Sequence, residues 1–176
     1  LQLCEEGLWV GYDQEIRCYP SYSNGVRTQC SKTLKPGEQD VTRFTCKKNL
    51  VVAATRYLAM LGIFSKQSWI FISRRCACIS AFDATTGEKL QHLQHCHLSD
   101  IHCVDFHGET VVSGSRDSTV KMWRLLATSA DDVHLRTLNV GSRIWSLAIA
   151  PDGRSFVTGS AGWNPTAPLH VWDLNT

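Results

Sequence analysis

Apolar and polar residues alternate along much of the chain, in short runs separated by turn-forming residues. The clearest unit covers residues 97–124, where the runs IHCVDF, TVVSGS and TVKMWR are separated by the turn sequences HGE and RDS. Successive side chains on a strand point to opposite faces of a sheet, so a period of two is typical of strands. The unit therefore predicts three antiparallel strands joined by tight turns.

The same order of strands and turns returns elsewhere, which indicates internal repeats. From Arg143, the sequence RIWSLAIAPDGRSFVTGSAGWNPTAPLHVWDL repeats it, with Pro-Asp-Gly in the first turn. Two degenerate copies precede the clear unit: DVTRFTCKKNLVVAAT followed by CISAFDATTG, and LWVGYDQEIRCYP. In each copy an aromatic residue occupies the third strand: Tyr19, Phe82, Trp123 and Trp172. The interval between Phe82 and Trp123 fits the roughly 40–45 residues of such a repeat.

The interval from Tyr19 to Phe82 is longer, and the excess matches residues 57–75, YLAMLGIFSKQSWIFISRR. This insert is interrupted by polar residues and is too short an apolar run to span a membrane. Three explanations remain open: a binding loop, a disordered insert, or the product of alternative splicing or an unremoved intron. We favour the last, because an exposed apolar run promotes aggregation and because the insert separates residues 51–54 from the strand they should pair with.

The motifs SGSRDSTVKMW and PLHVWDL resemble the WD-repeat family, and the runs DVTRF, NLVVAA and RIWSLAIAP are similar to those of its F-box/WD-repeat members. The resemblance covers nearly the whole chain. It implies an all-β fold: a partial WD-repeat β-propeller of about four antiparallel blades, the first incomplete, that does not close into a ring. The expected blades are residues 1–33, 34–94 with the insert, 95–138, and 139–176, the last truncated at its third strand.

The resemblance also implies a structural tetrad of hydrogen-bonded side chains in the third copy: His97, Ser113, Asp117 and Trp123. Such a network satisfies polar groups that would otherwise be buried without partners. In the second and fourth copies Gly37 and Val140 occupy the histidine position. We therefore expect those two blades to depend on apolar packing.

The same Ser, His and Asp could suggest a hydrolase, but Ser113 lies in a predicted strand and lacks the G-x-S-x-G turn that exposes a nucleophile. We therefore expect no enzymatic activity. The histidines and cysteines between residues 92 and 107 could suggest zinc. However, His102 and Cys103 are neighbours on a strand and point to opposite faces, so we expect no metal and no cofactor.

Composition limits which binding partners and which cellular location are expected. The net charge of +2 is small and its basic residues are scattered, so neither nucleic acid nor a membrane surface is an expected partner. Eight cysteines could suggest a secreted disulfide scaffold, but their spacing is irregular and the first residues do not resemble a signal peptide. We expect reduced, mostly buried thiols and a cytoplasmic or nuclear location.

The resemblance places peptide binding on the face formed by the loops that enter each first strand and the turns that follow each second strand. The candidate residues on this face are Asp40, Asp100, Arg116, Arg143, Trp163 and Asn164. Arg and Trp are frequent interface anchors, whereas most surface residues contribute little binding energy.

These features predict a recognition module that binds a protein client or a peptide degron. The resemblance to F-box/WD-repeat proteins implies that the chain is part of the substrate receptor of a Skp–cullin–F-box (SCF) ubiquitin ligase, which recruits clients for ubiquitination. The Skp adaptor and the cullin would then bind through an F-box outside this chain. The later blades of the propeller would also lie outside it. The alternatives are a WD-repeat scaffold of a complex unrelated to ubiquitin and, ranked last, a propeller hydrolase.

Overall fold

The computed structural model describes residues 1–4, 7–20, 29–36, 40–47, 50–65, 68–127, 129–161 and 168–174, with only the backbone described for part of them, including residues 57–76. Antiparallel strands dominate these residues, so the predicted all-β class is confirmed. No helix in these ranges is long and apolar enough to cross a membrane.

The strands form four sheets in chain order. The first sheet contains β1 (Gln2–Cys4), β2 (Gly7–Tyr12), β3 (Glu15–Tyr19) and β4 (Lys32–Leu34). The second contains β5 (Val41–Lys47), β6 (Leu50–Ser65), β7 (Ser68–Asp83) and β8 (Lys89–His97). The third contains β9 (Ile101–His107), β10 (Thr110–Ser115), β11 (Thr119–Arg124) and β12 (His134–Asn139), with the short helix η1 (Ala130–Asp132) before β12. The fourth contains β13 (Arg143–Ile149), β14 (Ser155–Ala161) and β15 (Leu169–Asp173).

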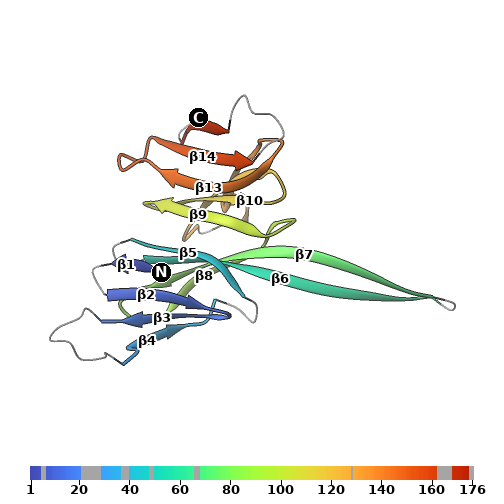
Figure 1. Cartoon of the computed structure of the whole chain (residues 1–176), viewed down its shortest axis with the longest axis horizontal. Coiled ribbons are helices and arrows are strands. Elements are labelled where there is room, and N and C mark those ends of the chain that lie inside the picture. Colours follow the sequence, from blue (N-terminus) through green and yellow to red (C-terminus); the bar gives the residue numbers. More distant parts are fainter. Residues whose placement is uncertain are drawn as a thin grey trace.

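The sheets lie one beside the next in chain order and do not close into a ring (Figure 1). The alternating pattern located three strands in each of the last three copies. The second and third sheets contain a fourth strand, β8 and β12, as the resemblance to a family with four-stranded blades implies, whereas the fourth sheet has three. The first sheet, expected to be incomplete, contains four strands, although β1 is only three residues long. Because Leu34 lies in β4 and His97 in β8, the sheets end slightly later than the predicted blade boundaries.

The insert does not separate residues 51–54 from their partner strand, so that prediction is wrong. In β6, Val51 pairs with Phe82 and Ala54 with Ile79, and the same register continues outward until Ser65 pairs with Ser68. Similar numbers of added residues on both sides of a hairpin lengthen it without shifting its register. β6 and β7 therefore form a long two-stranded arm that projects from the stack of sheets (Figure 1).

Three apolar clusters hold the sheets together, one at each junction. Alternation along the strands divides the side chains between junctions: Val51 packs towards the first sheet and Val52 towards the third, and both are fully buried. Similarly, Val111 packs towards the second sheet and Val112 towards the fourth. Each central sheet is therefore apolar on both faces, as expected of a layer between two neighbours.

Candidate functional site

The structure brings the four predicted tetrad residues together in one chain of hydrogen bonds. The His97 ring lies with Nε2 2.8 Å from Ser113 Oγ and Nδ1 3.0 Å from Asp117 Oδ2. Trp123 Nε1 donates to the same Ser113 Oγ at 2.9 Å. Because a carboxylate only accepts, His97 Nδ1 carries the proton that faces Asp117, and Nε2 accepts from the Ser113 hydroxyl. His97 belongs to the last strand of the second sheet, so the network fastens the second sheet to the third.

Asp117 fixes the tight turn between β10 and β11. Its carboxylate accepts hydrogen bonds from the Leu98 N–H at 3.0 Å, the Thr119 N–H at 3.0 Å and the Thr119 hydroxyl at 2.6 Å. Burial alone would raise the pKa of Asp117, but the bonds from His97, Thr119 and Leu98 outweigh it and hold this pKa well below its usual range. Burial lowers the pKa of His97 despite the nearby carboxylate, so the imidazole is neutral near neutral pH.

The tetrad has the composition of a catalytic triad but not its accessibility. Ser113 is 0% exposed and His97 is 1% exposed, so a dissolved substrate cannot reach the hydroxyl. The Ser113 oxygen is also occupied by the Trp123 and His97 contacts. This arrangement stabilises the fold rather than presenting a nucleophile.

The fourth sheet keeps half of this network, which corrects the expectation that it depends on apolar packing alone. Trp172 Nε1 donates to Thr158 Oγ1 at 2.9 Å, in positions equivalent to Trp123 and Ser113. The second sheet has Phe82 in the tryptophan position, buried within an apolar cluster. Gly37, in its histidine position, lies outside the described residues.

The exposed site is built by a different feature, a shift in strand pairing. The first strand of each of the last three sheets, β5, β9 and β13, contains such a shift at the equivalent position. The register shifts between Val41 and Arg43, between Ile101 and Cys103, and between Ile144 and Ser146. The residues skipped by the pairing are Thr42, His102 and Trp145. A bulge redirects a side chain out of the strand's normal alternation, and bulges are frequent next to functional sites.

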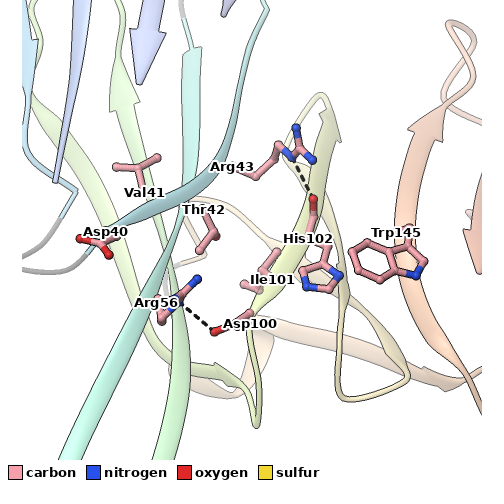
Figure 2. Close-up of a pocket in the computed structure, with 9 residues that line it drawn as sticks. All are labelled: Asp40, Val41, Thr42, Arg43, Arg56, Asp100, Ile101, His102 and Trp145. Carbon is pink, nitrogen blue, oxygen red and sulfur yellow. Dashed lines mark hydrogen bonds and ion pairs between the residues drawn. The ribbon is translucent and has the colours of Figure 1, made fainter. Parts of the chain in front are cut away.

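These three residues line one pocket of about 340 Å³ between neighbouring sheets (Figure 2). The His102 and Trp145 rings stack with centroids 4.4 Å apart and planes inclined by 20°. Arg43 Nε donates to the His102 carbonyl at 2.9 Å, which holds β5 against β9. Trp145 is nevertheless 50% exposed, so its ring is available to a partner.

Two of the predicted candidates, Asp40 and Asp100, lie in this pocket. Asp40 is exposed, whereas Asp100 is only 7% exposed. Asp100 Oδ1 forms an ion pair with Arg56 Nε of the second sheet at 3.2 Å, but it accepts no hydrogen bond. This ion pair crosses the junction between the second and third sheets, as Figure 2 shows.

The other candidates lie elsewhere. Arg116 and Arg143 are exposed but are not among the lining residues, and the Arg116 N–H donates to the Asp100 carbonyl at 3.0 Å. Trp163 and Asn164 fall outside the described residues. Sequence reasoning missed Trp145 because strict alternation does not show a bulge. The signal that could have found it is its alignment with Thr42 and His102 in the preceding repeats.

The histidines and cysteines considered for zinc are distributed among separate environments. His102 stacks on Trp145, His97 belongs to the tetrad, and Cys103 is buried at the junction of the third and fourth sheets. Burial raises the pKa of the Cys96 and Cys103 thiols to about 12, so both are protonated at neutral pH. Among the described residues, no three potential ligands lie close enough to hold a metal ion.

Comparison with known proteins identifies the repeats. The WD40 family (WD domain, G-beta repeat) matches residues 87–124 and 133–166. The chain is 44% identical over 80 residues to F-box/WD repeat-containing protein 4, also called dactylin, of both Mus musculus and Homo sapiens. That match covers 46% of this chain and 19% of either relative, so the chain corresponds to a small part of those proteins.

A weaker similarity extends to other proteins. The chain is 30% identical over 97 residues to the periodic tryptophan protein 2 homolog of Caenorhabditis elegans, covering 54% of this chain and 10% of that protein. Among solved structures, the computationally designed Ika4 protein superposes with a TM-score of 0.60 and 18% identity, covering 99% of this chain and 98% of Ika4. KlAtg21, in its complex with a coiled coil of AgAtg16, superposes with a TM-score of 0.69 and 16% identity, covering 98% of this chain and 51% of KlAtg21. At these identities the structural likeness shows the fold alone.

The matched repeats, the hydrogen-bonded tetrad and the four neighbouring sheets agree: residues 87–124 and 133–166 match the WD40 repeat, and the described sheets have the arrangement of part of a WD-repeat β-propeller.

Proposed function

We propose that the chain is the client-binding segment of a substrate receptor in a Skp–cullin–F-box (SCF) ubiquitin ligase. The observation that carries the proposal is the 44% identity over 80 residues to F-box/WD repeat-containing protein 4. The names of the similar proteins are not those of enzymes, and Ser113 and His97, which would be the nucleophile and the base of a hydrolase, are buried. The segment would therefore act by binding, without catalysis of its own.

The geometry suits such a role. The tetrad and the apolar clusters fix the sheets relative to one another, and the bulged strands present Trp145 and neighbouring polar groups at the surface. A rigid frame that carries an exposed aromatic residue loses little conformational entropy when a partner binds. A bound client would be held near a ubiquitin-charged enzyme, and ubiquitin transfer would be favoured by effective concentration.

In this proposal the adaptor and the cullin bind elsewhere. The chain corresponds to 19% of either F-box/WD relative, and an F-box in the longer protein would bind the Skp adaptor. The clients would be proteins or peptide degrons, and nucleic acids and membranes would not be ligands. The location would be the cytoplasm or the nucleus.

Affinity purification of the longer protein from cells tests the proposal. We expect the Skp adaptor and a cullin to copurify with it, and a matched form lacking the F-box to lose both while retaining its clients. Failure of the intact protein to retain the adaptor would refute the ubiquitin role.

The second candidate function is a scaffold in a complex unrelated to ubiquitin. It is favoured by the 30% identity over 97 residues to the periodic tryptophan protein 2 homolog, whose name contains no F-box. Sequencing the complete transcript separates the two functions, because the scaffold predicts no F-box. Reading across residues 57–75 in the same transcripts also tests whether every form contains the insert.

A further inference from the structure

An ion pair joins the second and third sheets at the ends of their first strands. Arg56 of β6 lies with Nε 3.2 Å from Oδ1 of Asp100, the residue before β9 (Figure 2). The backbone fixes the arginine as well, because the Arg56 N–H donates to the Asp40 carbonyl of its own sheet at 3.0 Å. At this junction a positive group of one sheet is therefore matched by a carboxylate of the next.

The third sheet repeats the arginine of this pair at Arg116. The residue before each arginine pairs with the first residue of the first strand in the same sheet, so Arg56 and Arg116 are equivalent. The Arg116 N–H also donates to the Asp100 carbonyl at 3.0 Å, as the Arg56 N–H donates to the Asp40 carbonyl. Arg116 is thus held at the third junction as Arg56 is held at the second.

The fourth sheet does not repeat the aspartate. Asp100 and Arg143 each directly precede a fully buried isoleucine of a first strand, so Arg143 occupies the position of Asp100. In the fourth sheet that isoleucine is Ile144, which packs closely against Gly114, two residues before Arg116. The third junction therefore has an arginine on both sides where the second junction has an arginine and a carboxylate.

These two positive charges are not balanced by the residues around them. Arg116 and Arg143 are exposed, and within the described part of the chain neither side chain forms an ion pair or a hydrogen bond. Two carboxylates lie close to Arg116 in the fold, but Asp100 is paired with Arg56, and Asp117 is bonded to His97 and to its own turn. Residues 162–167, which follow β14, include no acidic residue. Two neighbouring like charges without a counter-charge attract an anion.

We infer that Arg116 and Arg143 bind an acidic side chain of a protein partner, whose carboxylate takes the place that Asp100 has at the preceding junction. A guanidinium group presents several donors in a plane that matches the two oxygens of a carboxylate. Trp145, two residues further along β13, is half exposed and offers an apolar contact beside the charge. The inference rests on the proposed role of the segment in protein binding and specifies the chemistry of the client at this site.

Blocked tripeptides test the inference with the 176-residue chain: acetyl-Gly-Glu-Gly-amide and its glutamine, arginine and phosphoserine analogues. Glutamine matches the shape of glutamate without its charge. The backbone N–H signals of Arg116 and Arg143 are followed by NMR. We expect saturable shifts with the glutamate peptide and roughly fivefold weaker binding of the glutamine peptide, because charge-assisted hydrogen bonds are about twice as strong as neutral ones.

Neutral substitutions connect the binding to the two arginines. Arg116→Gln and Arg143→Gln should each weaken binding of the glutamate peptide by a factor of about two to five, as expected for exposed ion pairs. Arg124→Gln is the matched control. Arg124 is also exposed, but it pairs with Thr110 at the opposite end of the β10–β11 hairpin, so its substitution should leave binding unchanged.

A charge reversal tests the equivalence of the two junctions. Arg143→Asp would place a carboxylate opposite Arg116, in the position of Asp100. We expect binding of the glutamate peptide to weaken by about tenfold or more, because the new carboxylate repels the peptide and takes its place. We also expect the unfolding temperature to rise by about 1–3 °C, and Arg116→Gln in the same chain should abolish this rise.

The inference would be overturned by equal binding of the glutamate and glutamine peptides, by preferential binding of the arginine peptide, or by binding of the phosphoserine peptide alone. An unfolding temperature of Arg143→Asp that does not depend on Arg116 would also overturn it. None of these results concerns the adaptor. Copurification of the Skp adaptor with the longer protein would still support the ligase role, so the two proposals fail separately.

Discussion

The third and fourth sheets carry the same repeat, yet they are joined to the preceding sheet in different ways. Both place a tryptophan N–H on a hydroxyl, at Ser113 in the third sheet and at Thr158 in the fourth. Only the third adds His97, which comes from the second sheet and reaches Ser113 and Asp117 across the junction. Val140 occupies the equivalent position before the fourth sheet, so that junction lacks the histidine and is held by apolar packing together with a hydrogen bond from the Ile149 N–H to Asp105 Oδ2 at 2.9 Å. Each junction contains an apolar cluster, but only one adds the tetrad, so the junction with the tetrad is called the polar junction and the one without it the apolar junction.

The largest expected effect comes from truncating the tryptophan of the polar junction. Trp123→Ala removes a side chain that is 7% exposed and leaves Ser113 without its donor, so we expect a loss of about 3–5 kcal/mol in the free energy of unfolding. Trp172→Ala should cost roughly 1–2 kcal/mol because Trp172 is only partly buried. Urea denaturation of both variants measures the difference, and equal losses would contradict it.

Removing the histidine tests the polar junction itself. His97→Leu leaves Ser113 and Asp117 without their shared partner, and we expect a loss of about 2–3 kcal/mol in the free energy of unfolding. His134→Leu is the matched control. Its imidazole is exposed, bonds Thr137 in the same strand and meets the Trp123 ring edge-on with centroids 5.0 Å apart, a contact that leucine can keep, so the change should stay within about 0.5 kcal/mol. An unchanged free energy of unfolding in His97→Leu would show that the network does not fasten the sheets.

The apolar junction is tested by adding one methyl group. In Gly114→Ala the new Cβ would lie 2.5 Å from Ile144 Cγ2 and 2.7 Å from Cys103 Sγ, so we expect a loss of about 1–3 kcal/mol. Gly159→Ala changes the equivalent residue of the fourth sheet. There the Cβ would meet the Ser146 hydroxyl, which is exposed and can rotate, so the expected change is about 0.5 kcal/mol or less. Thermal unfolding of both variants measures the difference. A larger loss of stability in Gly159→Ala than in Gly114→Ala would contradict the close packing of Gly114 at this junction.

The smallest expected effect is on the dependence of stability on pH. The folded pKa of His97 lies below its ordinary value of 6.5, so on acidification the unfolded chain takes up this proton before the folded chain does. Stability is therefore fully present above about pH 6.5 and is lost as the pH falls through the folded pKa. His92, whose pKa burial also lowers, contributes in the same direction.

The depressed pKa of Asp117 adds a further loss below about pH 4. Denaturation curves between about pH 7 and pH 5 should therefore show decreasing stability, with a shallower decrease in His97→Leu. A stability that rises on acidification would contradict the neutral His97.

The repeat pattern predicted the fold and the tetrad because both depend on residues at fixed spacing. Asp117 lies in the turn RDS and Trp123 in the strand TVKMWR, so their positions in the sheet follow once the repeat folds. The alternating pattern did not locate the fourth strand of the second sheet, because β8, KLQHLQHCH, is largely polar and exposed and shows no clear period of two. The pocket was predicted only in part, because Trp145 reaches it through a bulge, and a bulge depends on packing between strands rather than on the local sequence.

The most direct test of the client-binding role is photo-crosslinking in cells. A photoreactive amino acid replaces Trp145 in the longer protein or, as a control, replaces Leu126, which is exposed and outside the pocket. We expect adducts at position 145 that carry ubiquitin, that are absent at position 126, and that lose their ubiquitin when the F-box is removed. Equal adducts at both positions, or adducts at position 145 that never carry ubiquitin, would contradict the account.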